Sequence, residues 1–230
     1  MDKKIVIAID GCSSSGKSTM AKNLAKKLEY IYVDTGAMYR AITLYALENG
    51  MLKEGAVCED ALQNSLQSIC ITLRKEENGN VATYLNGKNI ENKIRTMEVS
   101  NNVSLISRFK FVREAMVFQQ QEMGKGKGIV MDGRDIGTVV FPDAELKIFL
   151  TASLEVRAKR RMSELEAKGE KVSFDEVLKN LTERDRMDST REESPLIQAP
   201  DALLLDNSDL SIEEQQEWLL NAYRKVIDLK

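Results

Sequence analysis

The 230-residue chain is 43% hydrophobic, which is enough for one sizeable core or for a core with appendages. Its net charge of −3 and its 6% aromatic content argue against a surface built to hold polymeric nucleic acid, which needs cationic patches and stacking platforms. The lack of any histidine excludes an imidazole base, a Ser-His nucleophile and a histidine-bound metal, whereas phosphoryl transfer stays open because it depends chiefly on positioning and cationic stabilisation.

The first recognisable element is an apolar run, Ile5–Ile9, which is rich in β-branched residues and predicts a strand buried on both faces. Gly11–Ser18 then follows the pattern G-x-x-x-x-G-K-S of a phosphate-binding loop. Apolar residues recur at helical spacing over Ala21–Leu28, so a helix is expected to leave the loop. This order of strand, loop and helix is the context in which the motif binds phosphate.

The chemistry of the loop follows from its residue types. Gly11 and Gly16 allow backbone conformations that a Cβ would obstruct, and the free N–H groups of the loop and helix can then converge on one anion. Lys17 would bring a positive charge to the β- and γ-phosphates of a nucleotide, and the Ser18 hydroxyl would ligate Mg²⁺ directly or through water. The residues of this predicted nucleotide-phosphate site are Gly11, Cys12, Ser13, Ser14, Ser15, Gly16, Lys17, Ser18 and Thr19.

A second strand is predicted at Ile31–Val33, followed by Asp34-Thr35-Gly36 and a helix over about residues 37–48. Repetition of strand, loop and helix predicts a parallel sheet with right-handed crossovers. Because ligands bind at the carboxyl ends of such strands, we expect Asp34, Thr35, Tyr39 and Arg40 beside the phosphate loop. Tyr39 and Arg40 could equally be an ordinary pair on a helix surface.

The pattern changes between about residues 68 and 91. Strands are predicted at Ile69–Arg74 and Val81–Leu85, with tight turns at Asn78-Gly79 and Asn86-Gly87. Two such turns indicate an antiparallel meander, which is expected to be an insertion at the edge of the parallel sheet. Two roles stay open for this insertion: it determines substrate specificity, or it is a surface addition without a role in the activity.

A helical stretch is predicted from Arg95 to about Met123, with one apolar face at Val99, Val103 and Ile106 and another at Val112 and Met116. After the loop Gly124–Gly128, a third strand, Ile129–Met131, ends in Asp132. An apolar strand that ends in aspartate is a common setting for an acid that holds Mg²⁺ or its water shell. Asp132 therefore joins Ser18 as a candidate metal residue, possibly through water.

The last third of the chain combines two more strands with three capped helices. Leu146–Leu150 and Ala202–Leu205 are predicted strands, and helices are predicted after Ser153, Ser173 and Ser211. The first two of these helices carry many arginines, which pair on the surface in most proteins but match a phosphoryl group bidentately when they surround one.

The chain resembles bacterial cytidylate kinases, which are P-loop nucleoside monophosphate kinases. The resemblance rests on the phosphate loop, on Asp34–Arg40, on Asp132–Ala144 and on Glu183-Arg184-Asp185. These motifs occur in the same order as in that family and span nearly the whole chain. It implies transfer of the ATP γ-phosphate to CMP or dCMP, with Mg²⁺, by a cytoplasmic monomer.

The three cysteines are few and lack metal-type spacing, so they fit reduced thiols. The opening residues Met1–Lys4 predict no signal peptide.

The resemblance also implies roles for individual residues. Thr35, Ser104, Arg113 and Asp135 would read the cytosine ring, and Tyr39 would pack beside the nucleoside. Arg40, Arg134 and Arg191 would hold the CMP phosphate, while Arg184 and Asp188 would contact the sugar and help to place that phosphate. The residues expected to take part in catalysis are Lys17, Arg134, Arg157, Arg161 and Arg184.

The expected fold is a single α/β P-loop kinase domain with a five-stranded parallel sheet and helices on both faces. Its core would comprise about residues 1–60, 97–152 and 192–230, with an NMP-binding insertion over about 61–96 and an arginine-rich lid over about 153–191 that closes over ATP. Cys12, Ser14, Thr35 and Met187 depart from the residues usual in the family, and Thr35 could alter the preference for base or sugar.

Two other functions are weighed against this one. A P-loop kinase for UMP, AMP or a small metabolite would share the fold but not the cytosine-reading residues. A regulatory ATP-binding protein or GTPase switch needs no second arginine-rich pocket, and Asn92–Arg95 fails the Asn-Lys-x-Asp guanine motif at its last position.

Overall fold

The computed structural model describes residues 4–77, 81–167 and 169–228, and the chain divides into two compact units. The first, here called the sheet unit, comprises Met1–Val33 and Met123–Lys230. The second, here called the helical unit, comprises Asp34–Glu122. The predicted insertion at about 61–96 falls within the helical unit and the predicted lid at about 153–191 within the sheet unit, and the roles of both stretches stay predictions.

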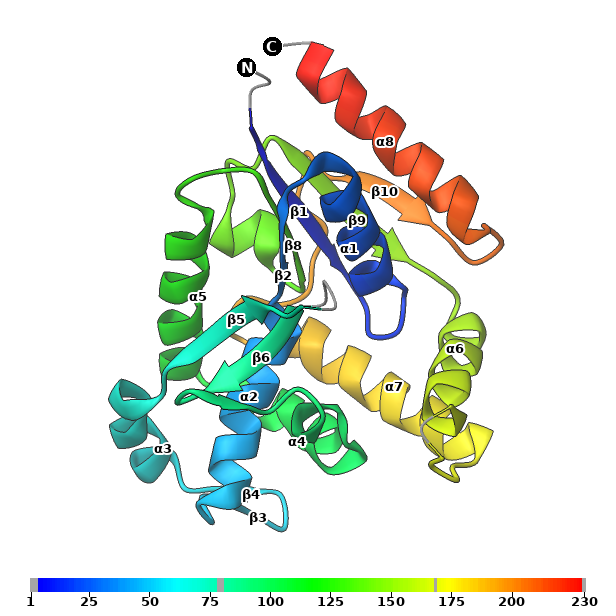
Figure 1. The fold of residues 1–230 in the computed structure, drawn as a ribbon. Coiled ribbons are helices and arrows are strands. Elements are labelled where there is room, and N and C mark those ends of the chain that lie inside the picture. Colours follow the sequence, from blue (N-terminus) through cyan, green and yellow to red (C-terminus); the bar gives the residue numbers. More distant parts are fainter. Residues whose placement is uncertain (1–3, 78–80, 168, 229–230) are drawn as a thin grey trace. The chain divides into compact units, whose positions relative to one another are not determined.

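The sheet unit is built on five strands in the order β10-β9-β1-β8-β2 (Figure 1). Their bounds are Val6–Gly11 for β1, Ile31–Asp34 for β2, Ile129–Gly133 for β8, Leu146–Thr151 for β9 and Leu203–Asp206 for β10. β1 lies at the centre and pairs in parallel with β8 and β9, and all of its residues are buried. The predicted five-stranded parallel core is confirmed.

Helices α1 (Lys17–Leu28) and α8 (Ile212–Asp228) pack together against this sheet (Figure 1). Their apolar residues join those of β1, β8, β9 and β10 in one core cluster, which includes Leu24 from α1 and Leu219 from α8. The remaining helices of the sheet unit are α6 (Leu154–Glu166), α7 (Phe174–Thr190) and the π-helical turn η3 (Ile136–Val140).

The predicted helix starts are confirmed by their capping contacts. The Ser153 hydroxyl accepts from the Val156 N–H, and Ser173 forms a reciprocal capping box with Glu176. Ser211 and Glu214 exchange the same pair of bonds at the start of α8. Each contact satisfies N–H groups that the first turn of a helix leaves without a helical partner.

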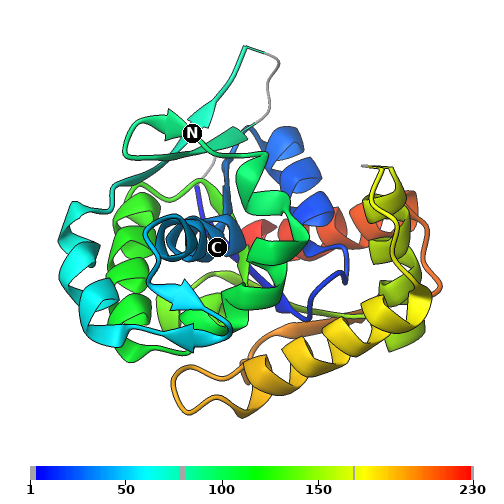
Figure 2. The same ribbon diagram turned by 90° about the horizontal axis from the view of Figure 1, so that it is seen from below.

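The helical unit surrounds helix α2 (Thr35–Glu48). Figure 2 shows α2, in blue, nearly end-on between the green helices α4 (Met97–Ser107) and α5 (Lys110–Gly124). A three-stranded antiparallel sheet comprises β5 (Ile71–Lys75), β6 (Val81–Leu85) and β7 (Lys88–Asn89). The smaller elements are the hairpin β3 (Leu52–Lys53) and β4 (Ala56–Val57), the helix α3 (Glu59–Ser65) and the 3₁₀ turns η1 (Leu66–Ser68) and η2 (Lys93–Arg95).

The predicted meander is confirmed in its main features. β5 and β6 pair antiparallel, with Ile71 opposite Leu85. Asn86 and Gly87 both have positive φ angles, of 48° and 80°, as a two-residue hairpin turn requires. The turn predicted at Asn78-Gly79 lies outside the described residues.

The prediction of one helical stretch from Arg95 to Met123 is wrong. Two helices, α4 and α5, are separated at Arg108-Phe109. On one continuous helix the Val99–Ile106 face and the Val112–Met116 face would point in directions about 125° apart, since each residue turns about 100°. The break lets both faces be buried, and Ile106 and Val112 are each fully inaccessible to solvent.

Sequence patterns did not reveal the hairpin of β3 and β4, helix α3 or the π-helical turn η3. In the part of the chain that the structure describes, no helix is both long enough and apolar enough to cross a membrane.

Candidate functional site

The phosphate loop joins the end of β1 to the start of α1, as predicted. Gly11 has φ = 148°, and a Cβ at this position would lie 2.0 Å from the carbonyl oxygen of Leu150 on the neighbouring strand β9. Gly16 has φ = 92° and forms the N-cap of α1. Both positions therefore require glycine, and together they turn the backbone so that α1 begins at Lys17.

Lys17 is buried and folds back over the loop. Its Nζ donates to the Cys12 carbonyl at 2.5 Å and to the Ser15 hydroxyl at 3.4 Å. Burial, aided by the positive charge of Arg134 and opposed by Asp132, lowers the pKa of Lys17 to about 7. An anion in the loop would favour the charged form of this amine, which is the form that stabilises phosphate.

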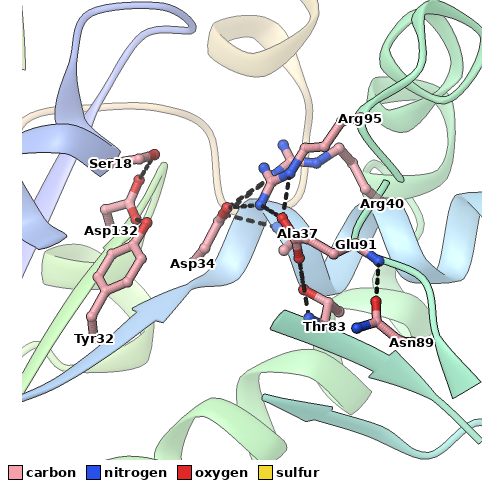
Figure 3. Close-up of polar contacts among 10 residues, drawn as sticks. All are labelled: Ser18, Tyr32, Asp34, Ala37, Arg40, Thr83, Asn89, Glu91, Arg95 and Asp132. Atoms are coloured by element: carbon pink, nitrogen blue, oxygen red, sulfur yellow. Dashed lines mark hydrogen bonds and ion pairs between the residues drawn. The ribbon is translucent and has the colours of Figure 1, made fainter. Parts of the chain in front are cut away.

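The two candidate metal residues are brought together. The Ser18 hydroxyl donates to Asp132 Oδ2 at 2.9 Å, and the Tyr32 hydroxyl donates to Asp132 Oδ1 at 2.9 Å (Figure 3). The pairing of Ile9 with Asp132 in the ladder of β1 and β8 places this carboxylate beside the loop. Sequence analysis missed Tyr32, whose position inside a short apolar strand gave no sign of a polar role.

These residues fit the chemistry of Mg²⁺. That ion is commonly held by one or two protein oxygens together with waters and substrate phosphates, so a hydroxyl and one buried carboxylate are a suitable donor set. Among the described residues no group of three or more acidic or cysteine side chains gathers at a metal-binding distance. Ser18 and Asp132 therefore stay the candidate residues for holding Mg²⁺ because their donor set fits the ion.

Asp10, the residue before the loop, was not singled out by sequence analysis. Its carboxylate is 4% exposed and accepts from the backbone N–H groups of Ile136 at 2.8 Å and Gly137 at 2.7 Å. These groups begin the π-helical turn η3 directly after Asp135. Burial raises the pKa of Asp10 and the two N–H donors lower it, with a net value of about 6.

Four of the predicted CMP-binding residues form one cluster in the sheet unit. Arg134 Nε donates to Asp188 Oδ2 at 2.8 Å, and Arg191 lies 3.8 Å from Asp188 Oδ1. Burial would raise the pKa of Asp188, but the charges of Arg134, Arg184 and Arg191 outweigh it and lower that pKa. Three guanidinium groups around one ionised carboxylate leave a net charge of about +2.

The arginines of α6 contact protein groups around the loop. Arg157 forms an ion pair with Asp185 at 2.7 Å and donates to the carbonyl oxygens of Ser13 and Ala152. Arg161 pairs with Glu164 at 3.2 Å on its own helix. Arg160 and Asn207, which sequence analysis missed, bond to the loop and to each other.

Of the remaining predicted CMP-binding residues, buried Asp135 lies in the sheet unit and the others lie in the helical unit. Thr35 is the buried first residue of α2, and Ser104 is buried on α4. The Arg113 guanidinium lies 5.3 Å from the centre of the Tyr39 ring and donates to the Ser107 carbonyl at 3.1 Å. The structure thus brings Tyr39 and Arg113 together.

Arg40 shares the carboxylate of Asp34 with a second arginine. Arg40 lies 3.0 Å and Arg95 2.9 Å from Asp34 Oδ2, and the Ala37 N–H donates to Asp34 Oδ1 (Figure 3). Burial would raise the pKa of Asp34, but these three partners together lower it to about 2. Arg95 also pairs with Glu91, and its position at the edge of a predicted helix gave no sign of this role.

A phosphate loop on the central strand of a parallel sheet, with an arginine cluster in the same unit, is the arrangement expected of a P-loop kinase. The cytidylate kinase family model matches residues 7–225, and the chain belongs to the cytidylate kinase family. A cytidylate kinase of Bacteroides fragilis is 64% identical over 226 residues, which cover 98% of this chain and 99% of that protein. A cytidylate kinase of Parabacteroides distasonis is 62% identical with the same coverage.

Among solved structures, a shikimate kinase from Bacteroides thetaiotaomicron aligns over 98% of this chain and 99% of its own, with a TM-score of 0.48 and 12% identity.

Proposed function

We propose that the protein transfers the γ-phosphoryl group of ATP to CMP and dCMP, giving CDP and dCDP, by direct in-line transfer. Membership of the cytidylate kinase family supports the acceptor. The single structural observation that carries the proposal is the cluster of Arg134, Arg184 and Arg191 around Asp188. A second site with a surplus of positive charge, in the unit that holds the phosphate loop, suits an enzyme that must bind both a donor and an acceptor phosphate.

The phosphate loop residues Gly11 to Thr19 are proposed to bind ATP. Their N–H groups and Lys17 would stabilise charge on the β- and γ-phosphates. Bound Mg²⁺, held by Ser18 and Asp132, would neutralise negative charge on the phosphates. No covalent enzyme intermediate is required, because positioning and electrostatic stabilisation account for most catalysis of phosphoryl transfer.

The acceptor is proposed to be held by the residues to which the family resemblance assigns it. Arg40, Arg134 and Arg191 would hold its phosphate, and Arg184 and Asp188 would contact its sugar. Thr35, Ser104, Arg113 and Asp135 would read the cytosine, with Tyr39 beside the nucleoside. A carboxylate and an arginine can pair with the amino donor and the acceptors of cytosine, and uracil would leave that carboxylate without a donor.

Arg157 and Arg161 are proposed to act in catalysis from a lid of about residues 153–191, and residues of about 61–96 to form an NMP-binding insertion. Closure of a lid would exclude water, which competes as phosphoryl acceptor. We further propose that the protein acts as a monomer in the cytoplasm, where its cysteines, none of which forms a disulfide among the described residues, would stay reduced.

A coupled assay of ADP release tests the proposal. Mg-ATP is supplied with CMP, dCMP, UMP, AMP or no acceptor, for the native sequence and for Asp135→Ala, with exposed Asp143→Ala as the control. Turnover with CMP and dCMP that collapses only in Asp135→Ala would support the proposal. Preference for another acceptor would discard the cytosine assignment, and ADP release without any acceptor would indicate a regulatory NTPase.

A further inference from the structure

The carbonyl oxygen of Ser15, inside the phosphate loop, accepts hydrogen bonds from two side chains that come from distant parts of the chain. Asn207 Nδ2 donates to it at 2.9 Å and Arg160 Nη1 at 3.2 Å. Asn207 follows β10 and Arg160 belongs to α6, and all these residues lie in the sheet unit. Because two donors hold it, this carbonyl has one well-defined direction.

Asn207 is itself fixed by hydrogen bonds of both its side chain and its backbone. It is fully buried, its Oδ1 and backbone carbonyl both accept from Arg160, and its Nδ2 also donates to Gln215 Oε1 at 2.9 Å. Its backbone N–H donates to the Thr151 carbonyl at the end of β9. A buried amide with all of these bonds made has a single orientation, and so it is a rigid support for the loop.

The direction of the Ser15 carbonyl decides the direction of the next N–H group. In a planar trans peptide the C=O and the following N–H point in opposite directions. Since Asn207 and Arg160 draw the Ser15 carbonyl toward themselves, the Gly16 N–H must point away from them. A side chain at Gly16 would also meet this support, because its Cβ would lie 3.4 Å from Asn207 Nδ2.

A second carbonyl of the loop is held in the same way. Arg157 Nη1 donates to the Ser13 carbonyl at 3.2 Å, which fixes the direction of the Ser14 N–H. Ser14 has φ = 57°, a conformation that costs energy for any residue with a Cβ and that persists only where surrounding contacts hold it. Arg157 is anchored in turn by its ion pair with Asp185.

We propose that Asn207 and Arg160, with Arg157, are positioning residues that aim the Gly16 and Ser14 N–H groups at the phosphates of the nucleotide. The inference rests on the proposed function only in taking the loop as the nucleotide-phosphate site, and it adds Asn207 and Arg160 to the residues on which that site depends. None of the three needs to touch the ligand for this effect.

The test compares Asn207→Ala and Arg160→Lys with Lys159→Ala, an exposed neighbour on α6 that pairs only with exposed Glu155 among the described contacts. The probe is ADP, with binding measured by calorimetry, and the KM for CMP is measured alongside. Asn207→Ala should weaken ADP binding about tenfold, the effect of losing one hydrogen bond that holds the loop. Arg160→Lys keeps the positive charge but loses the planar guanidinium that donates several hydrogen bonds in fixed directions, and it should also weaken ADP binding.

Three readouts separate positioning from a general loss of structure. The KM for CMP should stay unchanged in Asn207→Ala, and the loss in ADP affinity should be the same at low and high potassium chloride, since the removed amide is neutral. Glycine-selective ¹⁵N labelling reduces the amide spectrum to the 13 glycines. The Gly16 amide proton should move downfield on addition of ADP to the native protein and clearly less in Asn207→Ala.

The inference is overturned if Asn207→Ala folds and binds ADP as the native protein does, or if the Gly16 amide responds equally in both. Should Asn207→Ala fail to fold, Arg160→Lys decides, and native affinity in that variant overturns the inference. A native protein that binds ADP but phosphorylates none of the nucleotides would refute the proposed function, while the ADP measurements would still test the positioning of the loop.

Discussion

Replacing Asp10 by asparagine should change how the stability of the protein depends on pH. The Asp10 carboxylate is buried and accepts from the backbone N–H groups of Ile136 and Gly137. An asparagine has nearly the same shape, but it does not titrate, and it would turn an NH₂ group toward one of those donors. The variant therefore removes the charge and leaves one backbone donor poorly paired.

The magnitude follows from the pKa, which burial raises from 3.8 to about 6 in the folded protein. One pKa unit is equivalent to about 1.4 kcal/mol, so the ionised carboxylate costs the fold about 3 kcal/mol relative to its protonated form. A raised folded-state pKa contributes stability that is fully present below the unfolded pKa and is lost as the pH rises through the folded pKa. Between about pH 4.5 and about pH 7.5, the native protein should lose about 2 kcal/mol of unfolding free energy relative to Asp10→Asn.

Urea unfolding followed by the fluorescence of the single tryptophan measures this difference. Trp218 packs against the core cluster of the sheet unit, so its emission reports on the unit that contains Asp10. Taking the difference between native protein and variant at each pH cancels the titration of all other groups. Asp209→Asn, at an exposed position, is the control for loss of one aspartate. A difference between native protein and Asp10→Asn that stays constant within about 0.5 kcal/mol across this range would refute the reasoning.

Two further predictions concern the carboxylates of Asp34 and Asp132. Asp34→Asn should lower the unfolding free energy by about 2 to 4 kcal/mol near neutral pH, because the positive charges of Arg40 and Arg95 would lose the carboxylate that they share. The pKa of Asp34 is depressed to about 2, so the stabilising charge of its carboxylate is lost as the pH falls below about 4. In urea titrations, the difference in unfolding free energy between the native protein and Asp34→Asn should therefore shrink over that range. A difference that stays constant would contradict this prediction. Asp132→Asn should lower kcat about a hundredfold and raise the Mg²⁺ concentration needed for half-maximal rate. An unchanged Mg²⁺ dependence would contradict the assignment of Asp132.

The parts of this protein that could be predicted from sequence are those set by short-range patterns. The strand of Ile5–Ile9 and the loop of Gly11–Ser18 are contiguous, and their residue types alone determine the backbone they adopt. The caps at Ser153, Ser173 and Ser211 are equally local, because the side chain and the N–H group it meets are three residues apart. Each of these predictions is confirmed.

Contacts between distant residues could not be predicted in this way. Asn207 and Ser15 are 192 positions apart, and Asp10 and Ile136 are 126 apart. Asparagine after a strand and aspartate before a glycine are common turn residues, so neither position suggested the long-range contact that it makes. The break between α4 and α5 was also missed, although the change in direction of the apolar face along one predicted helix was a sign of it.

The proposed site for the CMP phosphate combines three arginines with one acid, Asp188. If Arg134, Arg184 and Arg191 stood alone, their mutual repulsion would spread them apart and no common direction would be kept. The ionised carboxylate neutralises one of the three charges, and its 2.8 Å bond to Arg134 Nε fixes the orientation of that guanidinium. The remaining charge of about +2 equals, with opposite sign, that of a phosphate monoester dianion. Asp188 therefore fixes Arg134 within the proposed phosphate site, and a bound phosphate group would balance the remaining charge of that site.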